Sequence, residues 1–180
     1  VSFSNFLISI LLVRFYGIEV FGQFALAFLF IHFFSSIQHS LIISPMMTIG
    51  AKIKRSNIKN NYFEGLLFKQ LLYGFFSSAL VFLILFNADI FFPDYNLKVF
   101  LLNLPLALFF IQFHEFVRKL FYTENKLQDV LGLDLMYHFV RFLLIFSLYN
   151  FLSIGFEKVF LIYLFTSLLS SFLFLNKIIK

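Results

Sequence analysis

The chain has 180 residues, of which 61% are hydrophobic and 13% are charged, and its formal net charge is +5. A soluble domain is about half apolar and about one quarter charged, so this composition excludes an ordinary soluble domain and predicts a protein that crosses a membrane several times. The lack of cysteine excludes disulfides, thiolate metal sites and cysteine nucleophiles. The basic residues lie in short segments between apolar runs, where they orient a chain in a bilayer, so we do not expect nucleic-acid binding.

Apolar segments follow one another along the whole chain. They cover roughly residues 1–13, 23–49, 63–87, 98–117, 130–150 and 157–176. The first is shorter than the roughly 20 residues that a transmembrane helix needs, so we expect the chain to be a fragment whose first helix is truncated. The other five have the length of helices that cross a hydrocarbon core about 30 Å thick. We therefore expect an all-α integral membrane protein, a six-transmembrane-helix bundle in which residues 1–180 form a single transmembrane domain.

Lysine and arginine are distributed unevenly between the connecting segments. Residues 51–62, 118–129 and 176–180 together hold nine of them, whereas the opposite loops hold only Arg14, Lys98 and Lys158. Cytoplasmic loops carry the excess of basic residues in membrane proteins. The sequence therefore predicts a cytoplasmic amino terminus and a cytoplasmic 51–62 loop.

A polar stripe interrupts the fifth apolar segment, in DLMYHFVRF (134–142). Asp134, His138 and Arg141 have the spacing i, i+4 and i+7, which places them on one face of a helix. A charge in the middle of a membrane helix costs at least about 2.5–3.5 kcal/mol. Asp134 is about 10 Å along the helix from Arg141, too far for direct pairing, but His138 could relay a hydrogen bond between them. The stripe is thus a structural network between helices, a substrate-facing site or a group near the membrane interface.

Other polar residues occur singly in the apolar segments. They are His32, Gln38 and His39 in the second, Lys69 in the third, and Asn103 and Gln112 in the fourth. We expect Asn103 and Gln112 to join neighbouring helices, and Lys69 to lie near the cytoplasmic interface. Pro45 and Pro105 fall inside predicted helices, where each removes a backbone hydrogen bond and is expected to bend its helix.

Signatures of common enzymes are missing from the sequence. The stretch HEFVR (114–118) begins like a zinc protease motif, but it ends in Arg118 where that motif needs histidine. No nucleophile elbow, phosphate-binding loop or dinucleotide-binding fingerprint occurs. We therefore expect neither an enzyme nor a metal or other cofactor.

Two stretches resemble bacterial polysaccharide and O-antigen flippases, which belong to the multidrug/oligosaccharidyl-lipid/polysaccharide exporter superfamily. The first is LLVRFYGIEVFGQFALAFLF (11–30), in which a basic residue, a glycine and an acid precede a Phe-Gly pair. The second lies within 116–142, where a basic pair precedes an aromatic residue, a polar loop and an aspartate. The matching positions are Arg14, Gly17, Glu19, Phe21 and Gly22 in the first, and Arg118, Lys119, Phe121, Tyr122 and Asp134 in the second.

This resemblance implies the amino-terminal lobe of a two-lobed MATE-like exporter in the inner membrane of a bacterium, with the second lobe missing. It implies movement of a lipid-linked oligosaccharide, carried on a polyprenyl pyrophosphate, across the membrane by alternating access. A polysaccharide polymerase or glycosyltransferases are the further partners it implies. The candidate substrate-binding residues are Arg141, His138, Asp134, Lys69 and Arg14.

Two alternatives stay open at this point. A drug/cation antiporter of the same superfamily would need a cavity lined with acids, and the cations at Arg141 and Lys69 argue against it. The other is a small membrane subunit that only scaffolds a partner complex, and a full-length gene about twice this size would exclude it.

Overall fold

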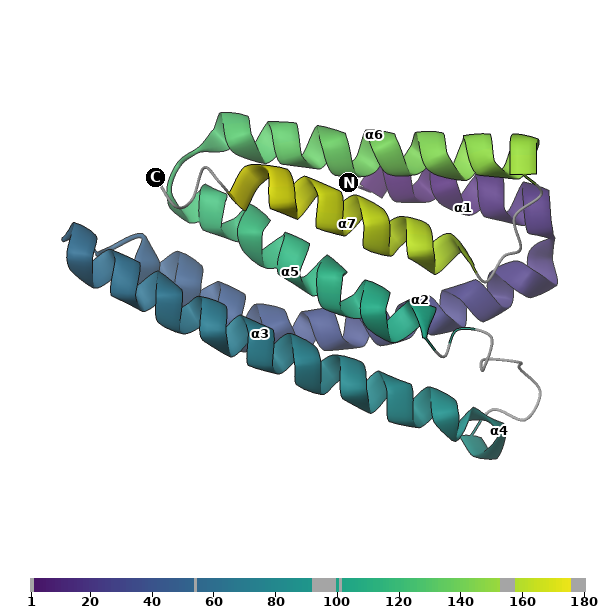
Figure 1. Ribbon diagram of the computed structural model, residues 1–180, viewed down its shortest axis with the longest axis horizontal. Helices are drawn as coiled ribbons and strands as arrows, with labels where there is room; N and C mark the ends of the chain where they lie inside the picture. The colour runs from purple at the N-terminus through teal and green to yellow at the C-terminus, as the bar shows by residue number, and fades with distance from the viewer. Residues whose placement is uncertain (1, 54, 92–99, 101, 153–157, 176–180) are drawn as a thin grey trace.

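The computed structural model describes residues 2–53, 55–91, 100, 102–152 and 158–175, and within them it contains helices and turns but no strand. The helices in chain order are α1 (Ser2–Tyr16), α2 (Ile18–Gln38), α3 (Ser56–Phe86), α4 (Ala88–Phe91), α5 (Asn103–Thr123), α6 (Leu127–Leu152) and α7 (Val159–Leu175) (Figure 1). Two π-helical stretches, η1 (His39–Ile43) and η2 (Met46–Gly50), continue α2. The expectation of an all-α chain holds for the described residues.

Three of these helices are long and apolar enough to cross a membrane. They are residues Ile18–Gly50, Asn57–Phe86 and Leu127–Ser147. The apolar helices Phe6–Tyr16 and Val159–Leu173 are shorter. The described chain is therefore compatible with a membrane location, while the six-span bundle stays a prediction.

Helix α5 extends further than the sequence predicted. The segment 118–129 was expected to be a loop, but helix continues to Thr123 and resumes at Leu127. The charged residues at this end are stabilised within the helix itself, because Glu115 pairs with Arg118 at 2.8 Å and with Lys119 at 3.7 Å. Asn125 then adopts a left-handed backbone conformation, with φ at 58°, and ends the helix.

The two prolines in the apolar segments behave differently. Pro45 lies between η1 and η2, so the missing backbone donor coincides with a stretch of widened helix. Its carbonyl oxygen accepts a hydrogen bond from Tyr62 Oη at 3.1 Å, which ties this stretch to α3. Pro105 is the third residue of α5, within the first turn, where no intrahelical hydrogen bond is lost. The expected bend at Pro105 is therefore wrong.

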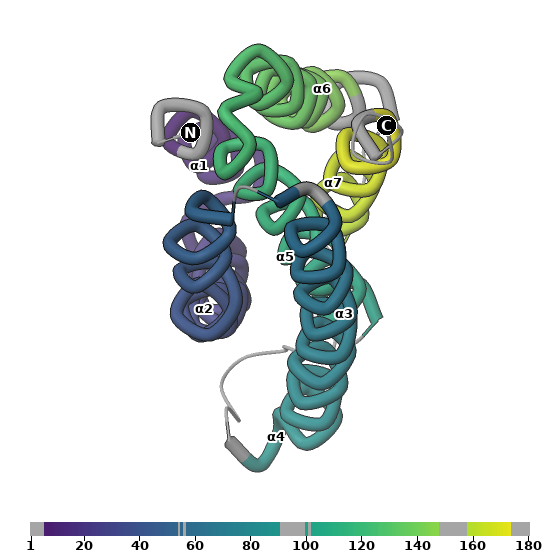
Figure 2. The backbone as a smooth tube through the Cα atoms, turned by 90° about the vertical axis from the view of Figure 1, so that its left-hand side faces the viewer, coloured from purple at the N-terminus to yellow at the C-terminus, as the bar shows by residue number. Residues whose placement is uncertain are grey.

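Helix α5 lies at the centre of the bundle, against α3 and α7, with α2 and α6 on its other side (Figure 2). A buried polar network fastens it to α2 and α3. Gln38 Nε2 donates to Gln70 Oε1 at 2.9 Å and to the Gln112 carbonyl oxygen at 2.8 Å. Ser77 Oγ donates to Gln112 Oε1 at 2.9 Å. The expectation that Gln112 joins neighbouring helices is confirmed.

The described parts of the basic segments 51–62 and 118–129 lie at one end of the bundle. The connection from η2 to α3, the turn from α5 to α6 and the final residues of α7 lie together there (Figure 1). Lys59 at the start of α3 pairs with Glu124 in the α5–α6 turn, with Nζ and Oε1 3.6 Å apart. Four of the basic residues used for orientation, Lys54, Lys98, Lys177 and Lys180, lie outside the described residues. The orientation of the chain in a membrane stays a prediction.

Candidate functional site

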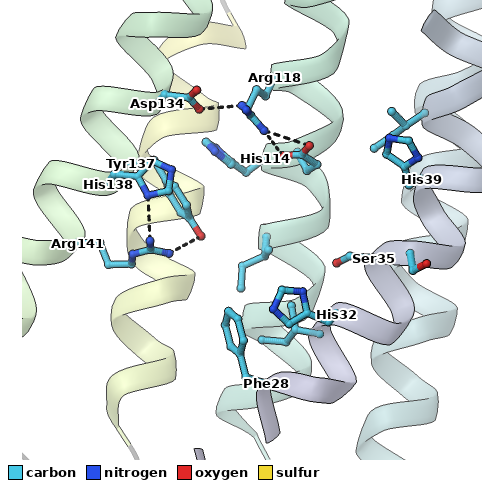
Figure 3. A pocket seen from close by; sticks show the side chains of 15 residues that line it. Phe28, His32, Ser35, His39, His114, Arg118, Asp134, Tyr137, His138 and Arg141 are labelled. Atoms are coloured by element: carbon cyan, nitrogen blue, oxygen red, sulfur yellow. Dashed lines mark hydrogen bonds and ion pairs between the residues drawn. The ribbon is translucent and has the colours of Figure 1, made fainter. Parts of the chain in front are cut away.

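A cavity of about 420 Å³ lies between α2 with η1 on one side and α5 with α6 on the other (Figure 3). Its volume falls within the range of about 300–1,000 Å³ that is usual for small-molecule sites. All four histidines of the chain line it: His32, His39, His114 and His138. Such a gathering of polar groups in an apolar helical protein makes this cavity the candidate site.

Helix α6 places its polar stripe on the wall of this cavity. Asp134, His138 and Arg141 all line it, together with Tyr137, so the spacing correctly predicted a shared face. Arg141 is only 2% exposed. Its Nη1 donates to Tyr137 Oη at 3.1 Å, and its Nη2 is 2.9 Å from His138 Nδ1. The guanidinium carbon also lies 4.6 Å and 4.5 Å from the ring centres of Tyr137 and Tyr163, which favours the cation.

The contact between Arg141 and His138 fixes which ring nitrogen carries a proton. Guanidinium nitrogens only donate hydrogen bonds, so His138 Nδ1 must accept. The ring is then neutral and its proton lies on Nε2, which is left as a donor. Tyr137 Oη also accepts from Arg141, so its own hydroxyl proton can be donated elsewhere. The group around Arg141 is therefore rich in donors and suits a ligand rich in acceptors.

Asp134 has a different partner from the one expected. Its Oδ1 lies 2.8 Å from Arg118 Nε on α5, an ion pair that is not aligned as a hydrogen bond. Arg118 Nη1 also donates to both oxygens of Glu115, at 2.8 Å and 3.2 Å. Among the described residues no hydrogen bond joins Asp134 to His138, so the relay to Arg141 that the spacing allowed is not formed there. The ion pair between Asp134 and Arg118 fits the alternative of a structural network between helices. The guanidinium of Arg118, on the facing helix, attracts the carboxylate more strongly than a neutral ring.

His114 supports this wall from behind. It is 4% exposed, and its ring stacks on Tyr137 with the ring centres 4.1 Å apart. Its Nδ1 is 2.9 Å from Ser170 Oγ of α7. His114 thereby connects three helices and holds the Tyr137 ring in place beside Arg141.

The remaining predicted site residues lie elsewhere. Lys69 is exposed on α3 and Arg14 is exposed near the end of α1, and neither lines the cavity. Both positions suit a lysine or arginine whose charged end reaches the membrane surface. The structure therefore does not bring them together with Arg141.

Sequence reasoning missed several residues of the site. Glu115 and Arg118 lie in the HEFVR stretch, which was rejected as a zinc motif. Arg118 was otherwise considered only as a basic residue of a loop and as part of the resemblance to flippases, and Glu115 was not considered further. The residues of α5 that line the cavity are Ile111, His114, Glu115 and Arg118, and their spacing of i, i+3, i+4 and i+7 was the available signal. Among the described residues no group of histidines and acids is arranged to hold a metal ion.

Comparison with known proteins identifies no relative. No family model matches the chain, no curated protein matches it, and no solved structure matches it. The function must therefore be argued from the geometry and chemistry of the cavity.

Proposed function

We propose that the chain is one lobe of a bacterial inner-membrane flippase that moves a lipid-linked oligosaccharide from the cytoplasmic to the outer leaflet by alternating access. The carrier is a polyprenyl pyrophosphate. The observation that supports this best is the guanidinium of Arg141, buried in the wall of a polar cavity within an apolar helical protein.

The position of Arg141 favours an anionic ligand. It lies about 21 Å from the start of α6, at 1.5 Å per residue, which is midway along the helix. Any headgroup that crosses the membrane through this cavity must pass that depth. The contacts with Tyr137 and His138 hold the guanidinium in one orientation. A guanidinium group can donate to two phosphate oxygens at once through N–H groups that are not already bonded.

The acids of the cavity argue against a cation antiporter. Asp134 and Glu115 both line the cavity, but both are ion-paired with Arg118. A cationic substrate would have to displace a guanidinium from two carboxylates. A scaffold without transport activity would have no need of the polar cavity, whose groups are costly in a membrane.

The test is the variant Arg141→Ala in the chromosomal gene of the native host. We expect surface polysaccharide to be lost while the amount of protein in the membrane stays normal. Arg141→Lys keeps the charge but not the fork, and should retain part of the export. Lys69→Ala is the matched control, because Lys69 is a cation outside the cavity. Normal export from a well-expressed Arg141→Ala protein would disprove the proposal, and altered drug resistance with normal polysaccharide would favour the antiporter.

A further inference from the structure

The wall formed by α2 and η1 differs in character from the wall formed by α5 and α6. It carries four neutral polar side chains, His32, Ser35, Ser36 and His39, in the spacing i, i+3, i+4 and i+7. We call these four residues the α2 row. The ionic groups of the cavity, in contrast, all come from the opposite wall.

Within the described chain, the side chains of the α2 row make no hydrogen bond to protein. Ser40 and Thr48, which do not line the cavity, show the usual alternative: each returns its hydroxyl to its own helix, to the Ser36 carbonyl at 3.2 Å and the Ser44 carbonyl at 2.9 Å. Ser35 and Ser36 both line the cavity, and among the described residues neither hydroxyl bonds to its own helix.

This difference matters because of where the row lies. Residues Ile18–Gly50 form an apolar helix long enough to cross a membrane. Polar groups at membrane depth are costly unless water or a ligand satisfies them. The α2 row is therefore a surface that needs a hydrogen-bonding occupant.

The row has the chemistry that recognises sugar hydroxyls. A serine hydroxyl and a neutral imidazole each offer both a donor and an acceptor, as a sugar hydroxyl does. Phe28 continues the same face of α2 and contacts His32 edge to face, with the ring centres 4.8 Å apart. Phe28 is partly buried and also stacks on Phe24. It still lines the cavity, and an aromatic ring there suits the apolar C–H face of a sugar ring.

We propose that the α2 row binds the uncharged sugar portion of the substrate, while the opposite wall holds its pyrophosphate. This inference rests on the proposed function and assigns a different part of the substrate to each of the two walls. The cavity would then recognise two parts of one substrate. The first is the charged pyrophosphate, which is common to all carriers, and the second is the uncharged sugar, which differs between substrates.

The test measures binding to the full native protein in lipid nanodiscs. Two probes are compared: bare undecaprenyl pyrophosphate, and undecaprenyl pyrophosphate that carries the oligosaccharide extracted from the same host. The wild-type protein should bind the sugar-bearing probe more tightly. His32→Leu and His39→Leu should each lower the affinity for the sugar-bearing probe about 2- to 10-fold, which corresponds to the loss of one neutral hydrogen bond. The affinity for the bare probe should stay unchanged.

Three controls keep the result interpretable. His32→Gln retains a donor and an acceptor and should keep most of the preference for sugar. Ser40→Ala, beside the row but outside the cavity, should bind both probes as the wild type does. Arg141→Ala should weaken both probes by the same factor.

The outcomes separate the two proposals. If Arg141→Ala weakens both probes but His32→Leu and His39→Leu leave the preference for sugar intact, the assignment of the α2 row is wrong and the proposed function survives. If the wild-type protein fails to bind bare undecaprenyl pyrophosphate, or if Arg141→Ala has no effect, the proposed function is wrong and the inference with it.

Discussion

Asp134 of α6 and Arg118 of α5 lie 2.8 Å apart, from Oδ1 to Nε, and this ion pair joins two helices that line one wall of the cavity. Arg118 is shared, because Glu115 on its own helix also binds it. The negative end of the α6 stripe is thus used to position α5, while the positive end remains at the cavity wall. Although Asp134 and Arg141 share one face of α6, they contact different partners: Asp134 pairs with Arg118 of α5, and Arg141 contacts Tyr137 and His138 of its own helix.

Removing the shared cation should cost more stability than removing one of its acids. In Asp134→Asn, Arg118 keeps its pair with Glu115, and we expect a loss of about 1 kcal/mol or less for a half-buried ion pair. In Arg118→Leu, two carboxylates are left facing the cavity without their shared partner, and we expect a loss of about 3 kcal/mol. Thermal unfolding of the purified protein measures both. Equal losses would show that the three groups do not act as one cluster.

Gly50 is a position where a side chain does not fit. A Cβ atom there would lie 2.8 Å from the Phe63 ring and 3.3 Å from Thr123, at the point where η2 meets α3 and α5. We expect Gly50→Ala to lower the free energy of unfolding by about 1–3 kcal/mol, the usual cost of overpacking. Gly65→Ala is the matched control, since no atom lies within 4 Å of its Cβ. Similar melting temperatures for the two variants would contradict the close approach.

The proposed topology predicts which end of the bundle faces the cytoplasm. The chain has no cysteine, so single cysteines can be introduced without background. Asn57→Cys, exposed near the start of α3, should resist an impermeant thiol reagent in intact cells and react after the membrane is opened. Glu19→Cys, exposed at the other end of the bundle, should react in intact cells. The reverse labelling would invert the orientation and with it the direction of transport.

Helical periodicity was enough to predict that Asp134, His138 and Arg141 share a face, because the geometry of one helix fixes it. The partners of these residues could not be predicted in the same way. They depend on where α5 lies, and Arg118 was assigned to a loop because charges usually mark the end of an apolar segment. Its i, i+3 pairing with Glu115 keeps it helical instead.

The sequence identified only part of the α2 row. His32 and His39 stood out as polar residues in an apolar segment, but sequence alone could not show that His114 and His138 meet them at one cavity. Serines in a helix usually bond to their own backbone, so Ser35 and Ser36 gave no signal. Only the packing of α2 across from α6 shows that the α2 row lines the same cavity as His114 and His138 (Figure 3).

Two tyrosines beside Arg141 allow its orientation to be tested without changing its charge. Both rings lie about 4.5 Å from the guanidinium carbon, at 4.6 Å for Tyr137 and 4.5 Å for Tyr163. The Tyr137 hydroxyl accepts a hydrogen bond from Arg141 Nη1 at 3.1 Å. Replacement of either tyrosine by phenylalanine keeps the ring and its attraction for the cation. Tyr137→Phe additionally removes the hydrogen bond that holds Nη1.

On the proposed function, we expect Tyr137→Phe to reduce polysaccharide export about 3- to 10-fold, because the Arg141 guanidinium loses one of the hydrogen bonds that orient it. Tyr163→Phe should export normally. Surface polysaccharide is measured in the native host, with the membrane level of each variant determined in parallel. A fall in protein abundance that matches the fall in export would show that Tyr137 only stabilises the fold. Equal export by both variants at normal abundance would mean that the orientation of Arg141 is not set by Tyr137, and that transport does not depend on its fork.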